Sequence, residues 1–315
     1  MTRFILTRLG LVIPTFIGIT FLAFFLIRLV PGDPIETMAG ERGIDPVRHE
    51  ILRKEYGFDR PVLVQYASYI GRLLQGDLGQ SITSQQQVLP LILARLWISA
   101  QVVLVAVLLA ALVAVPAGVI AAWRQNSLID LAAVGTATLL LSVPTFWLGL
   151  LLLLLLGLHL QWLPVVGYVA IGEDPWRGLV YLVMPILTLF LHEIGVILRM
   201  ARASTLEVLR LDYITHARAK GLSEAAVLWR HAFKNAFGPT WTLIGLVLGN
   251  LLGGIAVVET VFTIPGLGRL LVDSIFARDY PVIQGCLLFV AITYVLVNLV
   301  VDLCYPIFDP RVAVE

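Results

Sequence analysis

The chain alternates long stretches without charged residues and shorter segments in which Asp, Glu, Lys and Arg gather. A helix that crosses the roughly 30 Å hydrocarbon core of a bilayer needs about 20 mostly apolar residues. Six stretches meet this requirement. One of them, Gly178–Leu198, contains His192 and Glu193, and the other five contain no Asp, Glu, Lys or Arg: Leu9–Ile27, Leu96–Trp123, Leu131–Gly172, Asn235–Val258 and Tyr280–Val301. The pattern predicts an all-α membrane protein with about six transmembrane helices.

Two of these stretches admit a second interpretation. Leu9–Ile27 could be a cleaved signal peptide, but no small-residue cleavage site follows it, and we expect a retained first helix. Leu131–Gly172 is long enough for one helix with a tail or for two short helices. We predict one helix there, because its leucine-rich run ends at Gln161–Pro164, a sequence typical of a membrane interface.

The composition narrows the class of protein. Hydrophobic residues make up 59% of the 315 positions and charged residues only 14%, whereas a soluble domain has roughly a quarter charged residues. This composition excludes a disordered chain, which needs low hydrophobicity and high net charge. The net charge of +1 disfavours a nucleic-acid-binding protein, whose surface would be strongly basic.

The distribution of Lys and Arg predicts the orientation, because short cytoplasmic loops carry an excess of both. The densest group lies between the fourth and fifth predicted helices, where seven basic residues face three acidic ones. Both termini are then cytoplasmic. The chain divides into an N-terminal transmembrane helix (1–30), an extracytoplasmic loop (31–95) and a core of five transmembrane helices (96–315) with a cytoplasmic segment at 204–236. In the loop, apolar residues at helical spacing over Leu63–Leu74 predict an amphipathic helix that packs on the spans or serves as a docking surface.

The sequence lacks the motifs of a self-sufficient enzyme. It has no G-x-x-x-x-G-K-[ST] phosphate loop, so it cannot hydrolyse ATP by that device. It also has no H-E-x-x-H, no G-x-S-x-G and no Cys and His cluster with zinc spacing. We therefore expect no catalytic residue, no metal site and no cofactor on this chain, and transport is favoured over a membrane-embedded enzyme.

The segment between the fourth and fifth helices has the most specific local pattern. Leu206–Lys220 has helical spacing and precedes Gly221, which can adopt the left-handed conformation after a last turn. Ser223 is a candidate N-cap for a second helix that reaches about Phe237. Small residues alternate with basic ones in this segment. The small side chains would let a partner approach the backbone closely, and the basic side chains could form ion pairs with acidic groups of that partner. The alternatives are an ordinary basic loop and, less favoured because spans tether both ends, a nucleic-acid-binding helix pair.

Polar side chains inside the predicted spans are candidates for a substrate path, because they are costly in lipid and usually face a cavity or a partner. His192 and Glu193 lie near the middle of the fourth helix, and Asn250 lies among Gly245, Gly249 and Gly253 in the fifth. A structural hydrogen bond to a neighbouring helix is the alternative role for His192 and Glu193. Close helix packing is the alternative for the stripe of Asn250 and glycines.

Several motifs together resemble a known family. The run Y-I-T-H-A-R-A-K-G-L over 213–222, followed by H-A-F-K-N-A over 231–236, resembles the cytoplasmic coupling segment of permeases of binding-protein-dependent ABC importers, whose signature is E-A-A-x-x-x-G-x9-I-x-L-P. Ala217 and Gly221 have the signature spacing, whereas Thr215 and Lys234 depart from it as in the peptide and nickel branch. Further stretches similar to the B-type permeases of dipeptide, oligopeptide, glutathione and nickel importers occur in order at 28–34, 56–61, 76–81, 258–271, 278–284, 298–302 and 309–311.

The resemblance implies a type I ABC importer permease fold in the bacterial cytoplasmic (inner) membrane. It implies pairing with a second, homologous permease, two cytoplasmic ATPase subunits that hold ATP and magnesium, and an extracytoplasmic substrate-binding protein. We also expect contact with membrane lipid and none with nucleic acid. The residues implied to lie in a groove of one ATPase are Tyr213, Ile214, Thr215, His216, Ala217, Arg218, Ala219, Lys220, Gly221 and Leu222.

The substrate implied by the resemblance is a di- or oligopeptide. Nickel and glutathione remain open, because no residue of the chain encodes the choice. A stand-alone channel or secondary transporter is a further alternative. A secondary transporter more often shows internal repeats with broken helices, and no such repeat is found in the sequence.

Overall fold

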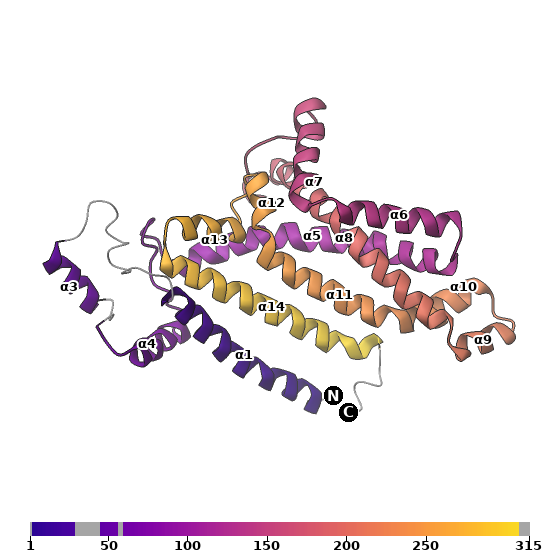
Figure 1. Ribbon diagram of the computed structural model, residues 1–315, viewed down its shortest axis with the longest axis horizontal. Coiled ribbons are helices and arrows are strands. Elements are labelled where there is room, and N and C mark those ends of the chain that lie inside the picture. The colour runs from indigo at the N-terminus through magenta and orange to yellow at the C-terminus, as the bar shows by residue number, and fades with distance from the viewer. Residues whose placement is uncertain (1, 29–44, 56–58, 309–315) are drawn as a thin grey trace.

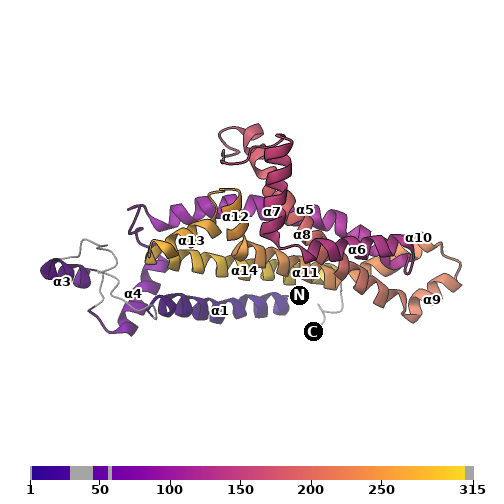
Figure 2. The same ribbon diagram turned by 45° about the horizontal axis from the view of Figure 1, so that its top comes forward.

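The computed structural model describes residues 2–28, 45–55 and 59–308. Within these residues the regular structure is helical, apart from one isolated bridge between Gln80 and Gln87. Five long helices lie side by side in both views (Figures 1 and 2): α1 (Thr2–Arg28), α5 (Val88–Trp123), α8 (Pro175–Leu209), α11 (Phe233–Gly254) and α14 (Tyr280–Phe308). The predicted all-α membrane fold is confirmed.

The lengths and composition of these helices fit a membrane. Four helical runs in the described residues are long and apolar enough to span one, namely Val88–Trp123, Pro175–Leu209, Glu224–Gly254 and Tyr280–Tyr305, and α1 contributes a shorter apolar stretch, Val12–Phe25. At about 1.5 Å per residue, a helix of 35 residues such as α8 extends well beyond the hydrocarbon core. Its ends therefore reach water on both sides.

The stretch Leu131–Gly172 does not form one helix, so that prediction was wrong. It contains α6 (Leu128–Ser142) and α7 (Thr145–Leu152), which continues as η2 (Leu153–His159), and the two parts are bent by 95°. Pro144 lacks an amide hydrogen and disfavours helical geometry in the preceding residue. Val143 is accordingly extended, with φ −93° and ψ 122°. In Figure 2, α7 rises out of the layer of long helices.

The core lies where α5, α8 and α11 meet, and small residues bring helices close together there. A Cβ on Gly118 of α5 would lie 2.6 Å from the carbonyl oxygen of Leu198 in α8. The stripe Gly245, Gly249 and Gly253 of α11 packs against Val301, Tyr294 and Val290 of α14. These glycines thus let α11 approach α14 closely, and Gly249 and Gly253 also line a cavity between α1, α11 and α14.

The bundle has two ends, which we call the loop end and the α9 end. The loop end carries α3 (Pro46–Glu55), α4 (Val62–Leu74) and α13 (Leu267–Phe276), and α12 (Ala256–Val261), which lies in the same half of the bundle but nearer its middle, is grouped with it. The α9 end carries α9 (Asp212–Ala219), α10 (Glu224–Ala226) and η3 (Val227–Ala232). Figure 1 places α3 and α9 at opposite extremes of the molecule.

Helix α4 is amphipathic, as predicted, and packs on α1. The Tyr66 and Tyr69 rings lie 5.2 and 5.6 Å from the Phe24 ring, and the Tyr66 hydroxyl lies 3.0 Å from Thr20 Oγ1. Burial raises the pKa of Tyr69 to about 12, so its hydroxyl is protonated at physiological pH. Leu63, which the sequence pattern places on the apolar face, is exposed. Within the described part of the loop, α4 thus packs on the end of a long helix.

Candidate functional site

The candidate site is the segment that joins α8 to α11 at the α9 end. Its first helix is shorter than predicted: Leu206–Lys220 is not continuous, because Leu211 is extended (φ −76°, ψ 145°) and separates α8 from α9. The predicted end of the helix is confirmed. The Gly221 amide donates to the Arg218 carbonyl over 2.9 Å, and Gly221 has φ +78°, which a residue without Cβ adopts at little cost.

The second helix begins as predicted and extends further. The Ser223 hydroxyl accepts a hydrogen bond from the Ala226 amide over 3.4 Å, which is the geometry of an N-cap. From Glu224 the chain stays helical through η3 and α11 to Gly254, so the prediction of a separate helix ending near Phe237 was wrong. The segment is therefore attached to the bundle by continuous helix on its C-terminal side.

One face of α9 is anchored in the helical bundle itself. Ile214 is fully buried and Ala217 is 7% exposed. Both lie in a cluster of small and aliphatic residues drawn from α5, α8, η3 and α11: Val119, Val208, Val227, Leu228, Ala232 and Ala236. Ala217 thus packs inward, and the small side chain serves the fit of α9 on its own bundle.

The other face of α9 is open. Its exposed residues, with those of the following turn, are Asp212, Tyr213, Thr215, His216, Arg218, Ala219, Lys220, Gly221 and Leu222. Arg218 donates to both carboxylate oxygens of Glu224 over 2.9 and 3.2 Å, and the Trp123 indole N–H donates to the same carboxylate over 3.4 Å. The Tyr213 hydroxyl accepts from Asn235 Nδ2 over 3.0 Å. Among the described residues Lys220 forms no ion pair, so its charge is available to a partner.

The residues predicted to line a substrate path lie in different places. Glu193 is 4% exposed in α8, and His192 beside it is half-buried, with an Nδ1 atom that has no hydrogen-bond partner among the described residues. Asn250 lies on the lining of a cavity of about 650 Å³ between α1, α11 and α14, together with Asn298 and Asp302. His192 and Glu193 do not line that cavity. Within one chain, the three predicted path residues are not brought together.

Sequence reasoning assigned no role to the buried carboxylate Glu259 of α12. Glu259 is fully buried and accepts hydrogen bonds from the Ser99 hydroxyl over 2.5 Å and from the Arg269 amide over 2.8 Å. A Cβ on Gly266 would lie only 2.0 Å from Glu259 Oε1. Glycine at 266 thus permits the carboxylate to reach the start of α13 and to fix the α12–α13 hairpin to α5.

A second buried carboxylate, Asp279, ties the loop before α5 to the start of α14. It accepts from the Ser81 hydroxyl over 2.5 Å, from the Thr83 hydroxyl over 2.8 Å and from the Ile82 amide over 3.1 Å. Residues 76–81 and 278–284 are both among the stretches that resemble the family, but the resemblance does not indicate that the two stretches touch. The signal that could have drawn attention to Asp279 is its position directly before the long apolar stretch Tyr280–Val301.

Comparison with known proteins assigns the fold and the segment to a family. Residues 114–314 match the binding-protein-dependent transport system inner membrane component, and residues 1–104 match the N-terminal part of such membrane components. The chain belongs to this family. It is therefore an inner-membrane permease, and a transport system of this kind includes a binding protein and an ATPase.

Two relatives resemble the permease over their whole length. The dipeptide transport system permease protein DppB of Escherichia coli (strain K12) is 42% identical over 335 aligned positions, which cover 99% of each chain. The di/tripeptide transport system permease protein DppB of Pseudomonas aeruginosa (strain UCBPP-PA14) is also 42% identical, with 99% of each chain covered. A chain in inward-facing structures of the MetNI methionine ABC transporter matches with a TM-score of 0.55 at 16% identity, over 69% of the permease and 96% of that chain. The expected ABC importer permease fold is confirmed.

Proposed function

We propose that this permease is a membrane subunit of an ATP-driven importer of di- and oligopeptides and forms half of its translocation path. The observation that supports the substrate class is the 42% identity, over 99% of each chain, to permeases named for dipeptide and di/tripeptide transport. The other half of the path is a second, homologous permease. ATP and Mg²⁺ belong to two cytoplasmic ATPase subunits and not to this chain.

The exposed face of α9 with its turn, residues 213–222, is the surface that binds one ATPase. Its geometry supports this role in two ways. The buried side of α9 is anchored by Ile214, so a force on the helix reaches the bundle. The open side offers apolar area on Tyr213 and Leu222, which are 39% and 41% exposed, next to the free charge of Lys220. This combination suits a groove with an apolar floor and an acidic rim.

Glu193 and His192 are the side chains we assign to the substrate path. The carboxylate of Glu193 has no hydrogen-bond partner among the described residues, although the side chain is almost fully buried in the middle of α8. Every peptide carries an amino group that a carboxylate can bind. Asn250 lines the cavity beside α14 instead, and we assign that face to contact with the second permease.

The substrate is tested with the complete transporter in proteoliposomes, made from the permease, its partner permease, the ATPases and the binding protein. We expect uptake of a radiolabelled dipeptide that requires both ATP and the binding protein. Parallel vesicles receive nickel or glutathione. Uptake of nickel or of glutathione instead of the dipeptide would reassign the substrate. Uptake by the permease without ATPases would show a channel or a secondary transporter.

The ATPase contact is tested by placing a charge on the exposed apolar surface. Leu222→Glu should reduce the amount of ATPase that copurifies with the permease, because the new carboxylate would face an acidic rim. Leu74→Glu is the matched control, since Leu74 is 77% exposed at the loop end. Equal copurification of the ATPase with both variants would contradict the assignment of residues 213–222.

A further inference from the structure

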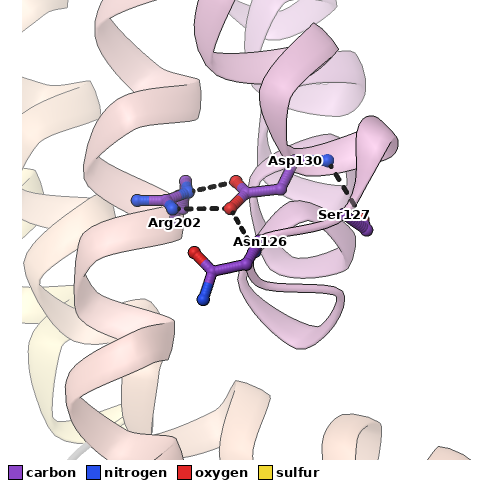
Figure 3. A network of polar contacts seen from close by, with 4 residues as sticks. All are labelled: Asn126, Ser127, Asp130 and Arg202. Carbon is purple, nitrogen blue, oxygen red and sulfur yellow. Dashed lines mark hydrogen bonds and ion pairs between the residues drawn. The ribbon is translucent and has the colours of Figure 1, made fainter.

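A buried ion pair joins two helices close to the α9 end. Arg202 of α8 donates from Nε to Asp130 Oδ1 over 2.5 Å and from Nη2 to Oδ2 over 2.8 Å, so the guanidinium and the carboxylate meet through two parallel hydrogen bonds (Figure 3). The side chains of Arg202 and Asp130 are 24% and 6% exposed. Such a two-bond contact fixes direction as well as distance, which a single ammonium contact does not.

The Asp130 side of the pair is held by the turn between α5 and α6. The Asn126 amide donates to Asp130 Oδ2 over 3.0 Å, and the Asp130 amide in turn donates to the Ser127 hydroxyl over 3.4 Å (Figure 3). Ser127 is the N-cap of α6, so Asp130 lies in the first turn of that helix. The carboxylate is therefore fixed relative to the backbone of the α5–α6 turn and of the first turn of α6.

The Arg202 side is held by direct contact between α8 and α5. A Cβ on Gly118 would lie 2.8 Å from the Ala201 Cβ and 3.0 Å from the Arg202 amide nitrogen. Since α5 runs into the turn that carries Asp130, the ion pair closes a triangle of three helices: α5 touches α8, α8 is bonded to α6, and α6 follows α5 along the chain.

This triangle is the base on which the proposed ATPase-binding segment sits. Helix α8 extends seven residues beyond Arg202, to Leu209, or about 10 Å. After the break at Leu211 it is followed by α9. Helix α5 meets the same segment through Val119, which packs with Ile214, and through Trp123, which donates to Glu224.

We propose that Asp130 and Arg202 are positioning residues that make the ends of α5, α6 and α8 one rigid base for α9. When an ATPase displaces α9, the rigid base then transmits the displacement to the long helices. Without the ion pair, α8 bends relative to the α5–α6 turn, and part of the displacement is lost. This proposal rests on the proposed function, because it assumes that α9 is the element that an ATPase displaces.

The test compares ATP hydrolysis and dipeptide uptake in the same proteoliposomes of the complete transporter. Asp130→Asn retains the size of the side chain but leaves Arg202 without a charged partner. We expect it to lower the uptake per ATP hydrolysed by about 2- to 30-fold, the range for residues that modulate coupling. Arg202→Lys keeps the charge, removes the second hydrogen bond and should lower the ratio less.

Asp174→Asn is the matched control. It removes the exposed ion pair between Asp174 and Arg177, 3.5 Å apart, at the other end of α8, and asparagine still caps the helix. The control should leave the ratio unchanged. If Asp130→Asn and Arg202→Lys instead reduce only the amount of folded transporter, uptake per ATP hydrolysed equals that of the control. This result would overturn the positioning role.

Hydrogen exchange separates this proposal from the proposed function, because it needs no transported substrate. In the purified transporter with Asp130→Asn, we expect faster amide exchange in residues 124–132 and 203–212 than in the parent. Unchanged exchange there overturns the rigid base whatever the transporter carries. Faster exchange in a transporter that takes up no dipeptide would support the rigid base and contradict the substrate assignment alone.

Discussion

The two ends of the bundle hold their acidic side chains in different ways. At the loop end, Glu259 and Asp279 accept hydrogen bonds from main-chain amides and hydroxyls. At the α9 end, Asp130 and Glu224 each meet the guanidinium group of an arginine, Arg202 or Arg218. Of these four carboxylates, the two at the loop end are therefore held by neutral donors, and each of the two at the α9 end is held by a cation. The ion pairs that the structure describes at the loop end are exposed ones.

The difference has a mechanical consequence. Main-chain donors belong to the loops they fix, so a carboxylate at the loop end determines the conformation of a whole turn. An ion pair at the α9 end joins two side chains on separate elements, so its loss chiefly loosens the contact between those elements. We therefore expect substitutions at the loop end to affect chiefly stability and substitutions at the α9 end to affect chiefly coupling.

Replacing Glu259 should have the largest effect on stability. Glu259→Ala would leave the Arg269 amide without its acceptor and the buried Ser99 hydroxyl with only the more distant Arg95 carbonyl, at a cost of about 3 to 5 kcal/mol. Gly266→Ala should cost about as much, because its Cβ would lie 2.0 Å from Glu259 Oε1. Thermal unfolding of the detergent-solubilised transporter measures both.

The double variant makes this prediction sharper. Once the Glu259 side chain is shortened to alanine, Gly266→Ala should add less than about 1 kcal/mol, since Gly266 has φ −93°, which alanine also adopts. Asp273→Asn, which removes an exposed ion pair with Arg269 on the same hairpin, should change stability by less than about 0.5 kcal/mol. Additive costs at 259 and 266 would show that the two residues do not share a contact.

Asp279→Ala should have the next largest effect and act more locally. It removes the acceptor of the Ser81 and Thr83 hydroxyls and of the Ile82 amide, which we expect to cost about 2 to 3 kcal/mol. Amide exchange in residues 80–86 should accelerate, while exchange in α9 stays unchanged. Faster exchange at both ends would mean that the loop end is not an independent unit.

Local features were predictable from the sequence, whereas distant contacts were not. Missing charges indicate a span, and Gly221 and Ser223 indicate a turn, because each signal lies within the segment it describes. Glu259 and Asp279 bind residues 160 and 198 positions away, which no local pattern indicates. The bend before Pro144 did have a local signal, the proline itself. The prediction of one helix rested instead on the length of the apolar run and on its end at Gln161–Pro164, and it did not consider Pro144.

Gly221→Ala tests the α9 end and should cause a smaller loss of stability. Both Gly221 (φ +78°) and Gly79 (φ +81°) are left-handed, and a Cβ on either would meet no atom within 4 Å. Each alanine substitution should therefore cost only the backbone strain, about 1 to 2 kcal/mol. The thermal shifts should match, but only Gly221→Ala should reduce ATPase copurification. A loss of ATPase with Gly79→Ala as well would remove the functional distinction between the two ends.

Glu224→Gln should have the smallest effect on stability. Its pair with Arg218 is open to water, with side chains 50% and 39% exposed, and an exposed ion pair contributes less than about 1 kcal/mol and weakens with salt. Glu50→Gln, which removes the exposed pair with Lys54 on α3, is the control and should match it in a thermal unfolding series at rising salt. A larger loss for Glu224→Gln that persists at high salt would mean that Glu224 holds α9 as firmly as Asp130 holds α8. Cationic partners at the α9 end would then fix the backbone as the neutral donors do at the loop end, and the mechanical distinction between the two ends would fail.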